Sequence, residues 1–397
     1  MTVFEATCTA PVNIAVVKYW GKRDTSLILP TNSSLSVTLS QDQLHSKTTI
    51  RASADFTSDR LWLNGIEESI EKNKRLVACL RETRALRRTQ IEDKDPSAPK
   101  ISNLAIHICS ENNFPTAAGL ASSASGYACL VYTLSKLFEL PLDASDLSIV
   151  ARQGSGSACR SLFGGFVAWE MGTKEDGSDS KAVQIAPETH WPDLQAMICV
   201  VSDEKKGTSS TEGMQLTVKT SALLQHRIKE VVPKRMEDMI AAIHNKDFPK
   251  FAELTMQDSN QFHAVCLDTY PPIFYMNDIS RAIIRIITEY NKDGVKAAYT
   301  FDAGPNAVIY APKDNMAEIY AILSHYFPNA AFDDSMGLLK ETALPSLPKS
   351  FDTRISPVFP EGSVKQILHT KADGGPRVLD SATHGLLNSE GLPKRLA

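Results

Sequence analysis

The spacing of apolar residues changes character along the chain. In the first half, short runs rich in Val, Ile, Thr and aromatic residues end in turn residues such as Asn64-Gly65, which is typical of β-strands. Between them, Leu76, Val77 and Leu80 recur at helical spacing. This pattern predicts strands at residues 3–10, 34–39, 47–51, 61–63, 104–109, 166–171 and 182–186, and helices at 70–84, 121–138 and 147–153.

A long helical stretch occupies most of the second half. Apolar residues recur three and four positions apart from residue 209 to about residue 289, and Pro233 separates two of the predicted helices. Around this stretch the pattern predicts strands at 194–202, 295–301, 307–311 and 364–370, a helix at 316–327 and loops at 328–362. The order predicts an α+β protein of two domains, residues 1–190 and 191–397.

Composition narrows the class of protein. The chain has 397 residues and a formal net charge of -4, without a long basic run, which argues against a nucleic-acid surface. No window approaches the roughly 18 apolar residues of a membrane span, and the N-terminal segment lacks a basic stretch followed by an apolar core. The seven scattered cysteines are typical of buried free thiols. We therefore expect a cytoplasmic protein that is not inserted in a membrane.

The stretch NFPTAAGLASSASG at residues 113–126 joins a predicted strand to a predicted helix. Small residues let backbone N–H groups approach a ligand, and the first turn of a helix leaves such donors unsatisfied. Gly119, Ser122 and Ser123 therefore indicate a phosphate site, although a helix start that is merely capped by serine has the same composition. The chain contains neither a Walker A loop nor a GxGxxG turn in the Rossmann position.

Longer motifs connect this stretch to a known group of enzymes. Residues 112–126 resemble the phosphate loop of the superfamily that contains galactokinase, homoserine kinase and mevalonate kinase, with Ala121 at its third small position. Three further segments resemble the mevalonate diphosphate decarboxylase family: TAPVNIAVVKYWGKRD at 9–24, GSGSACRSLFGGFVAWE at 154–170 and AYTFDAGPNAVI at 298–309. The resemblance runs from near the N-terminus to about residue 312 and is weaker after residue 330.

This resemblance implies both a fold and a reaction. The fold would be the two-domain α+β fold of the small-molecule kinase superfamily, with the active site in the cleft between a β-rich and a helix-rich domain. The reaction would use ATP and Mg²⁺ to phosphorylate the tertiary hydroxyl of mevalonate 5-diphosphate and then release phosphate and carbon dioxide. Family analogy also implies a homodimer.

The resemblance assigns Asp302 to the substrate hydroxyl, as a proton acceptor or an orienting group. Lys18 would approach Asp302 and the γ-phosphate, where a cation keeps the carboxylate ionised. A lone Asp before Ala303-Gly304 is otherwise most often an ordinary turn residue.

Arg160 would hold the substrate carboxylate, because a guanidinium presents a planar fork to two oxygens. Asn13 and Ser155 would lie beside it, and Gly156 and Ser157 would allow close approach of the ligand. The alternative is an arginine on the surface.

Tyr19 and Lys22, in the segment KYWGK, would contact the substrate diphosphate, together with Ser210 and Met214 of GTSSTEGM. Two lysines around aromatic residues are also compatible with an exposed strand edge or a weak nucleic-acid patch, but one such cluster lacks an extended basic face.

For the nucleotide, the family implies that Gly119, Ser122 and Ser123 meet the phosphates and that Asn112 approaches the nucleoside. Mg²⁺ would be held through phosphate oxygens, water and the hydroxyl of Ser123. Two other functions stay open: a relative that phosphorylates mevalonate or its monophosphate without decarboxylation, and a catalytically silent binding protein on the same fold.

Overall fold

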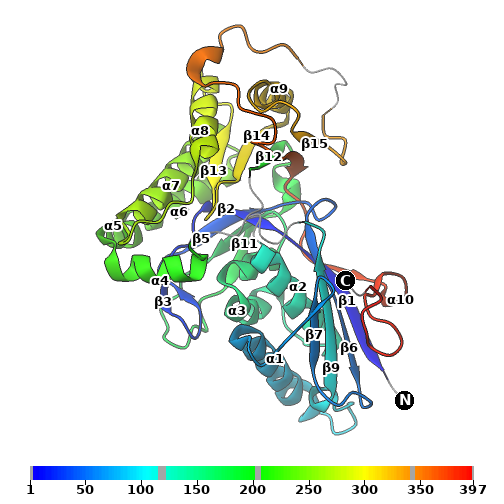
Figure 1. Cartoon of the computed structure of the whole chain (residues 1–397). Helices are drawn as coiled ribbons and strands as arrows, with labels where there is room; N and C mark the ends of the chain where they lie inside the picture. Colours follow the sequence, from blue (N-terminus) through cyan, green and yellow to red (C-terminus); the bar gives the residue numbers. More distant parts are fainter. Residues whose placement is uncertain (1–2, 115–121, 202–206, 340–344, 396–397) are drawn as a thin grey trace.

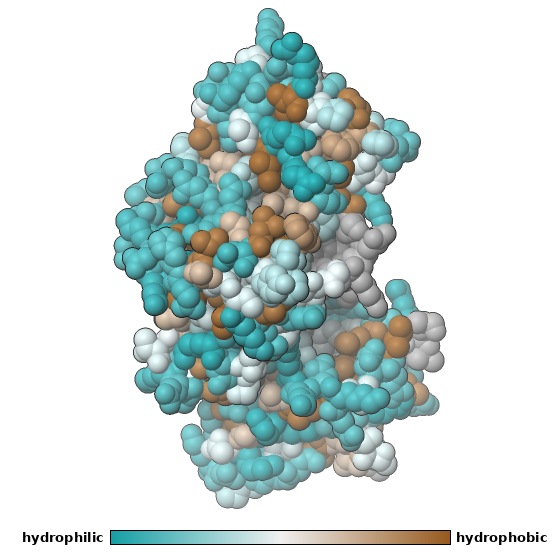
Figure 2. Space-filling view, turned by 60° about the vertical axis from the view of Figure 1, so that its left-hand side comes forward, coloured by the Kyte–Doolittle hydropathy of each residue, from teal (hydrophilic) through white to brown (hydrophobic). Residues whose placement is uncertain are grey.

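The computed structural model describes residues 3–114, 122–201, 207–339 and 345–395. It confirms the α+β class: three main β-sheets are stacked with helices between and around them, and both chain ends lie in the lower half of Figure 1. Figure 2 shows a largely hydrophilic face on which hydrophobic residues form small, scattered groups. No helix in the described part of the chain is long and apolar enough to span a membrane.

The first sheet has six strands in the order β17-β1-β6-β9-β7-β8. All neighbours are antiparallel except β7 and β9. Its strands are β1 (Phe4–Pro11), β6 (His45–Ser53), β7 (Arg60–Leu63), β8 (Ile66–Glu68), β9 (Ala105–Asn112) and β17 (Arg377–Leu379). Helices α1 (Lys74–Arg87), α2 (Ser122–Leu137) and α3 (Ala144–Gly154) accompany it, and Ile50, Ile108 and Leu134 lie in the core between sheet and helices.

The second sheet has the order β11-β10-β5-β2 and forms the middle of the molecule. Its strands are β2 (Asn13–Val17), β5 (Ser34–Thr38), β10 (Phe166–Trp169) and β11 (Ala182–Ala186), and a separate ribbon pairs β3 (Lys22–Asp24) with β4 (Leu29–Pro30). Every residue of β2, β5 and β10 is buried. The expected hairpin between residues 166–171 and 182–186 is confirmed, whereas β2 was not predicted.

The third sheet has the order β13-β14-β12-β16-β15. Its strands are β12 (Leu194–Val200), β13 (Ala298–Phe301), β14 (Ala307–Pro312), β15 (Ala331–Asp333) and β16 (Gln366–Lys371). Helices α4 (Ser210–Thr220), α5 (Ala222–His226), α6 (Val232–His244), α7 (Phe248–Asp268), α8 (Asp278–Tyr290) and α9 (Met316–Tyr326) belong to the same half of the chain. The expectation of loops throughout 328–362 was wrong for β15, because this short strand is stabilised by parallel pairing with the distant β16.

The sequence predicted that Pro233 separates two helices, but the helical run continues through it. A π-helical segment, Arg227–Val231, joins α5 directly to α6, and Pro233 stands in the first turn of α6. A missing backbone N–H costs little at that position, so the proline is tolerated there. The other short helical turns are Arg88–Glu92, Ile101–Asn103, Gly156–Leu162, Glu188–His190, Lys313–Asn315, Thr353–Ile355 and α10 (Ser381–His384).

The second and third sheets share one hydrophobic core. Ile14 and Val37 from the second sheet belong to the same buried cluster as Ile198 and Ile309 from the third, with Phe251 of α7 between them. All seven cysteines are buried and free, as predicted. The shared core holds the ends of β2 and β13 near each other, which positions the site described below.

The division into two domains at residue 190 stays a prediction. One feature of the structure links the last described part of the chain to the first sheet. Strand β17 pairs with β1, and the hydroxyl of Ser381 hydrogen-bonds that of Thr7 at 2.8 Å. Farther on, the backbone N–H of Leu386 donates to Thr49 Oγ1 at 2.9 Å. The last described residues of the chain therefore pack on the first sheet, although they follow the helix-rich half in sequence.

Candidate active site

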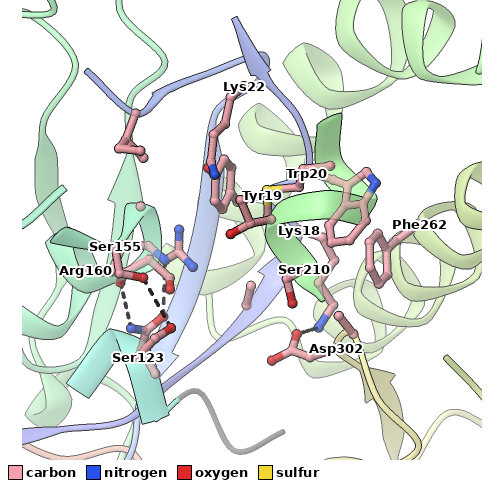
Figure 3. A pocket seen from close by; sticks show the side chains of 18 of the residues that line it. Lys18, Tyr19, Trp20, Lys22, Ser123, Ser155, Arg160, Ser210, Phe262 and Asp302 are labelled. Carbon is pink, nitrogen blue, oxygen red and sulfur yellow. Dashed lines mark hydrogen bonds and ion pairs between the residues drawn. The ribbon is translucent and has the colours of Figure 1, made fainter. Parts of the chain in front are cut away.

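A cavity of about 180 Å³, called the central pocket below, lies where β2, α4, α7 and the end of β13 meet (Figure 3). Twelve of the residues selected from the sequence line it: Asn13, Lys18, Tyr19, Lys22, Ser123, Ser155, Gly156, Ser157, Arg160, Ser210, Met214 and Asp302. Asn112 and Ser122 line a neighbouring pocket instead, and Gly119 lies outside the described residues. Segments far apart in sequence thus converge on one cavity.

Lys18 and Asp302 form an ion pair at the base of the central pocket. Lys18 follows β2 and Asp302 follows β13, and Lys18 Nζ lies 2.7 Å from Asp302 Oδ1. The side chain of Lys18 is 3% exposed and that of Asp302 is 31% exposed. The carboxylate is therefore held by a buried cation while one side of it stays accessible from the pocket.

Arg160 is buried in the helical turn Gly156–Leu162, not on the surface. Its Nη1 donates to Ser34 Oγ at 2.6 Å, and its Nε donates to Ser36 Oγ at 2.9 Å and to Asn13 Oδ1 at 3.3 Å. Burial lowers the pKa of Arg160 from its ordinary value. Within the described part of the chain no carboxylate forms an ion pair with this guanidinium, so its charge is unneutralised and favours an anionic ligand.

A second group of polar side chains lies around Lys22, across the pocket from Ser123 and Asp302 in Figure 3. Burial, and then the nearby Arg75, lower the pKa of Lys22 to about 8. Arg75 Nη2 donates to Thr211 Oγ1 at 2.9 Å, which links α1 to the first turn of α4 across the pocket. The hydroxyl of Tyr19 is buried and has no hydrogen-bond partner among the residues that the structure describes, and burial raises its pKa. These groups are suited to bind an anion.

Charge in the central pocket is strongly unbalanced. Among the described residues, its lining contains four cationic side chains, Lys18, Lys22, Arg75 and Arg160, and one carboxylate, Asp302, which leaves a surplus of three positive charges in that part of the lining. The protein as a whole has a net charge of -4. The excess is therefore local, and it selects for a ligand with several negative charges.

Ser123 connects the central pocket to a more apolar pocket of about 230 Å³ beside α2. Its hydroxyl lies 3.3 Å from that of Ser155. The apolar pocket has Leu61, Leu76 and Leu130 in its lining, with Asn112, Ser122 and Ser123 among its polar residues. A flat apolar group could occupy it while a charged extension reaches the central pocket past Ser123.

The candidate magnesium ligand is consistent with this geometry. The residues that the structure describes include no cluster of three or more His, Cys, Asp or Glu side chains that could hold a metal ion. The exposed Ser123, which lines both pockets, suits a hard cation that takes most of its ligands from phosphate and water.

Sequence reasoning missed Arg75, Thr211, Ser34 and Ser36. Arg75 is in the first turn of a correctly predicted helix, where a charged residue is normally solvated. Its position two residues after Asn73, the residue that caps α1, was the available signal, but its contact with α4 depends on how the two halves pack. Ser34 and Ser36 are two positions apart on β5 and therefore lie on the same face of the strand, where both accept hydrogen bonds from Arg160.

Comparison with known proteins gives matches to the same family in both halves of the chain. Family models match residues 10–182, described as a diphosphomevalonate decarboxylase-like N-terminal domain, and 196–379, described as a mevalonate 5-diphosphate decarboxylase C-terminal domain. The diphosphomevalonate decarboxylase of Ganoderma lucidum is 61% identical over 402 residues, covering 99% of this chain and 100% of that protein.

Solved structures agree with these matches. A crystal structure of mevalonate 5-diphosphate decarboxylase has a TM-score of 0.86 and 49% identity, covering 98% of this chain and 99% of that chain. A structure of MDDEF in complex with MVAPP, AMPPCP and magnesium has a TM-score of 0.74 and 30% identity, covering 96% of this chain and 100% of that one. The similarity therefore includes both halves of the molecule.

Proposed function

The chain belongs to the mevalonate 5-diphosphate decarboxylase family, and we propose that the central pocket carries out that family's reaction. The protein uses ATP to convert mevalonate 5-diphosphate to isopentenyl diphosphate, with release of ADP, phosphate and carbon dioxide. This reaction supplies isoprenoid precursors in the mevalonate pathway. The observation that carries the assignment to this pocket is the Lys18–Asp302 ion pair in a cavity with three further cationic side chains.

The substrate fits the distribution of charge. It carries a carboxylate at one end, a diphosphate at the other and a tertiary hydroxyl between them. Arg160 binds the carboxylate in this proposal, with Asn13 and Ser155 beside it. The diphosphate is bound by Tyr19, Lys22 and Arg75. The N-terminal part of α4 lies beside it and contributes Ser210, Thr211 and Met214 to the pocket. Gly156 and Ser157 allow the ligand to approach the backbone.

Between these two ends, Asp302 accepts the proton of the tertiary hydroxyl or orients it toward the γ-phosphorus. The hydroxyl oxygen forms a bond to that phosphorus, and the bond to the bridging oxygen of ADP breaks. Lys18, whose Nζ lies 2.7 Å from Asp302 Oδ1, offsets negative charge on the transferred group. The C–O bond to the new phosphate then breaks, and the electron pair of the bond to the carboxylate forms the double bond as carbon dioxide leaves. Asp302 stabilises positive charge at the tertiary carbon.

The nucleotide occupies the apolar pocket in this proposal. Its base lies near Asn112, and its phosphates pass Ser122 and Ser123 toward Asp302, with Gly119 completing the phosphate loop. The fit is supported by the lining of the apolar pocket and by the MDDEF structure, which holds AMPPCP and magnesium. Mg²⁺ held at Ser123 supplies charge neutralisation between the phosphates.

One assay distinguishes this function from its alternatives. The protein is incubated with ATP, Mg²⁺ and carboxyl-labelled mevalonate 5-diphosphate, and carbon dioxide and ADP are measured together. Equal amounts of the two products are expected. ADP without carbon dioxide would indicate a kinase that does not decarboxylate, and neither product would indicate a binding protein.

We also propose that the protein acts in the cytoplasm as a homodimer. The homodimer rests on family analogy, and the seven buried free thiols are typical of a reducing compartment. Light scattering during gel filtration gives the mass of the assembly, and imaging of a tagged full-length chain gives the compartment. A monomeric mass or an organellar signal would contradict the corresponding part.

A further inference from the structure

Two consecutive residues of α7, Asp258 and Ser259, reach two different segments of the central pocket. Asp258 contacts the backbone of Lys18, and Ser259 contacts the backbone of Phe301, the residue before Asp302. Helix α7 lies alongside both β2 and β13. One turn of one helix therefore supports both members of the Lys18–Asp302 ion pair.

Asp258 is completely buried and fully occupied by hydrogen bonds. Its Oδ2 accepts the backbone N–H of Lys18 at 2.7 Å, and Arg227 donates to both of its oxygens at 2.8 and 3.0 Å. Burial alone would raise the pKa of Asp258, but Arg227 and Arg235 bring it below its ordinary value. The carboxylate is therefore ionised and can hold the Lys18 amide strongly.

Arg227 holds the other side of the same residue. Its Nη2 donates to the carbonyl oxygen of Lys18 at 3.0 Å, so Asp258 and Arg227 together fix both backbone polar groups of Lys18. Arg227 begins the π-helical segment that links α5 to α6, and such segments often occur at functional sites. Arg235 donates to Asp258 at 2.9 Å and to Gln261, but it forms no hydrogen bond with Lys18.

Ser259 supports the partner strand. Strand β13 is at the edge of the third sheet, so alternate N–H groups have no neighbouring strand to bond. Ser259 Oγ accepts the N–H of Phe301 at 3.0 Å and fixes the residue from which Asp302 extends. The same helix turn thereby sets the positions of two strand ends from different sheets.

Building on the proposed function, we propose that Asp258, Ser259 and Arg227 are positioning residues for phosphoryl transfer. They hold the backbones of Lys18 and of Phe301, the residue before Asp302, so that Nζ of Lys18 and Oδ1 of Asp302 meet. None of the three is among the groups assigned above to substrate or nucleotide, so their effect passes through the ion pair. Misplacement of a reacting group by about 1 Å can lower a rate about 100-fold, which makes such support measurable.

Stability alone does not account for the arrangement. A buried ion pair is weak support for stability, because apolar residues of similar volume often serve as well. Arg227 and Arg235 both form ion pairs with Asp258, so a purely structural role predicts that the loss of rate in either variant follows its loss of stability. Of these two arginines, only Arg227 hydrogen-bonds Lys18, which provides a matched pair of variants.

The first experiment compares Arg227→Lys with Arg235→Lys in the full-length protein. A lysine retains the charge but cannot bond both oxygens of Asp258 and the Lys18 carbonyl together. We expect kcat to fall about 100-fold in Arg227→Lys with little change in the KM for mevalonate 5-diphosphate, and near-wild-type kcat in Arg235→Lys. Equal effects of the two substitutions, or a loss that follows the melting temperature, would overturn the proposal.

The second experiment places Arg227→Lys in a Lys18→Met background. If Arg227 acts through Lys18, adding its substitution should change kcat by less than about 3-fold once Lys18 is absent. A full additional 100-fold loss would mean that Arg227 acts by another route. Failure of wild-type protein to release carbon dioxide would instead remove the proposed function, so the two failures are distinguishable.

Discussion

Arg160 and Arg227 are both buried, but they have opposite surroundings. Arg227 is neutralised by the carboxylate of Asp258, whereas Arg160 is held by two serine hydroxyls and the amide of Asn13. The first arrangement satisfies the charge inside the protein, and the second leaves it for a ligand. In the proposed assignment of these two residues, the chemistry of the partner, more than burial, separates a supporting cation from a binding cation.

Among these predictions, the largest effect on kcat is expected from substitution of Asp302. Asp302→Asn should lower kcat about 1000-fold or more, because the group that accepts or orients the hydroxyl proton is lost. Nucleotide affinity and the melting temperature should change little, since the carboxylate is partly exposed. Steady-state kinetics, nucleotide titration and thermal unfolding measure the three quantities. Near-normal turnover would refute the role of Asp302.

A direct test of the comparison pairs Arg160→Gln with Arg227→Gln. Arg160→Gln should lower kcat/KM on the order of 100-fold while stability changes by less than about 1 kcal/mol, because no buried anion loses its partner. Arg227→Gln should lower the free energy of unfolding by about 3–5 kcal/mol, because Asp258 loses its main partner. Denaturant unfolding and kinetics separate the two. If both variants lose stability equally, the distinction between binding and supporting cations is wrong.

The pH dependence of kcat/KM tests the proposed role of Lys22 in binding the substrate. Because the pKa of Lys22 is lowered to about 8, kcat/KM for mevalonate 5-diphosphate should fall as pH rises through that value and Lys22 loses its charge. Arg75→Gln should move this limb to higher pH, since Arg75 contributes to the lowering. Lys22→Arg retains its charge and serves as the control. An unchanged limb in Lys22→Arg would assign the titration to another group.

The smallest effect is expected at the hydroxyls behind Arg160. Ser34→Ala removes one neutral hydrogen bond and should raise the KM about 5-fold. Ser26→Ala, an exposed serine that bonds only to Asp24, is the matched control and should have no effect. Equal kinetics of the two variants would show that Ser34 does not orient the guanidinium.

Much of this molecule could be predicted from local sequence. The helices with regular apolar spacing and most long strands were found within a few residues, because their patterns reflect which face is buried. Strands β15 and β17 were missed because each has three residues and forms only by pairing with a segment far along the chain. Strand β2 was missed because it begins two residues after Pro11, the last residue of β1, and a proline normally interrupts a strand.

The site shows the same limit. Motif residues such as Lys18, Arg160 and Asp302 could be selected because each stands in a segment that resembles a motif of a known enzyme family. Arg75 and Arg227 are ordinary helical arginines in sequence, and their contacts depend on the packing of distant helices. Asp258 is likewise one polar residue of a helix in sequence, and its contact with Lys18 depends on the packing of α7 against β2.

The pairing of β17 with β1 also affects how the protein is made. During synthesis β1 emerges first, but its outer neighbour is not available until residues 377–379 have left the ribosome. Until then β1 is an open edge that can pair with another nascent chain. Two strands far apart in the chain thus close the first sheet together, so this sheet cannot reach its final form before residues 377–379 have been synthesised.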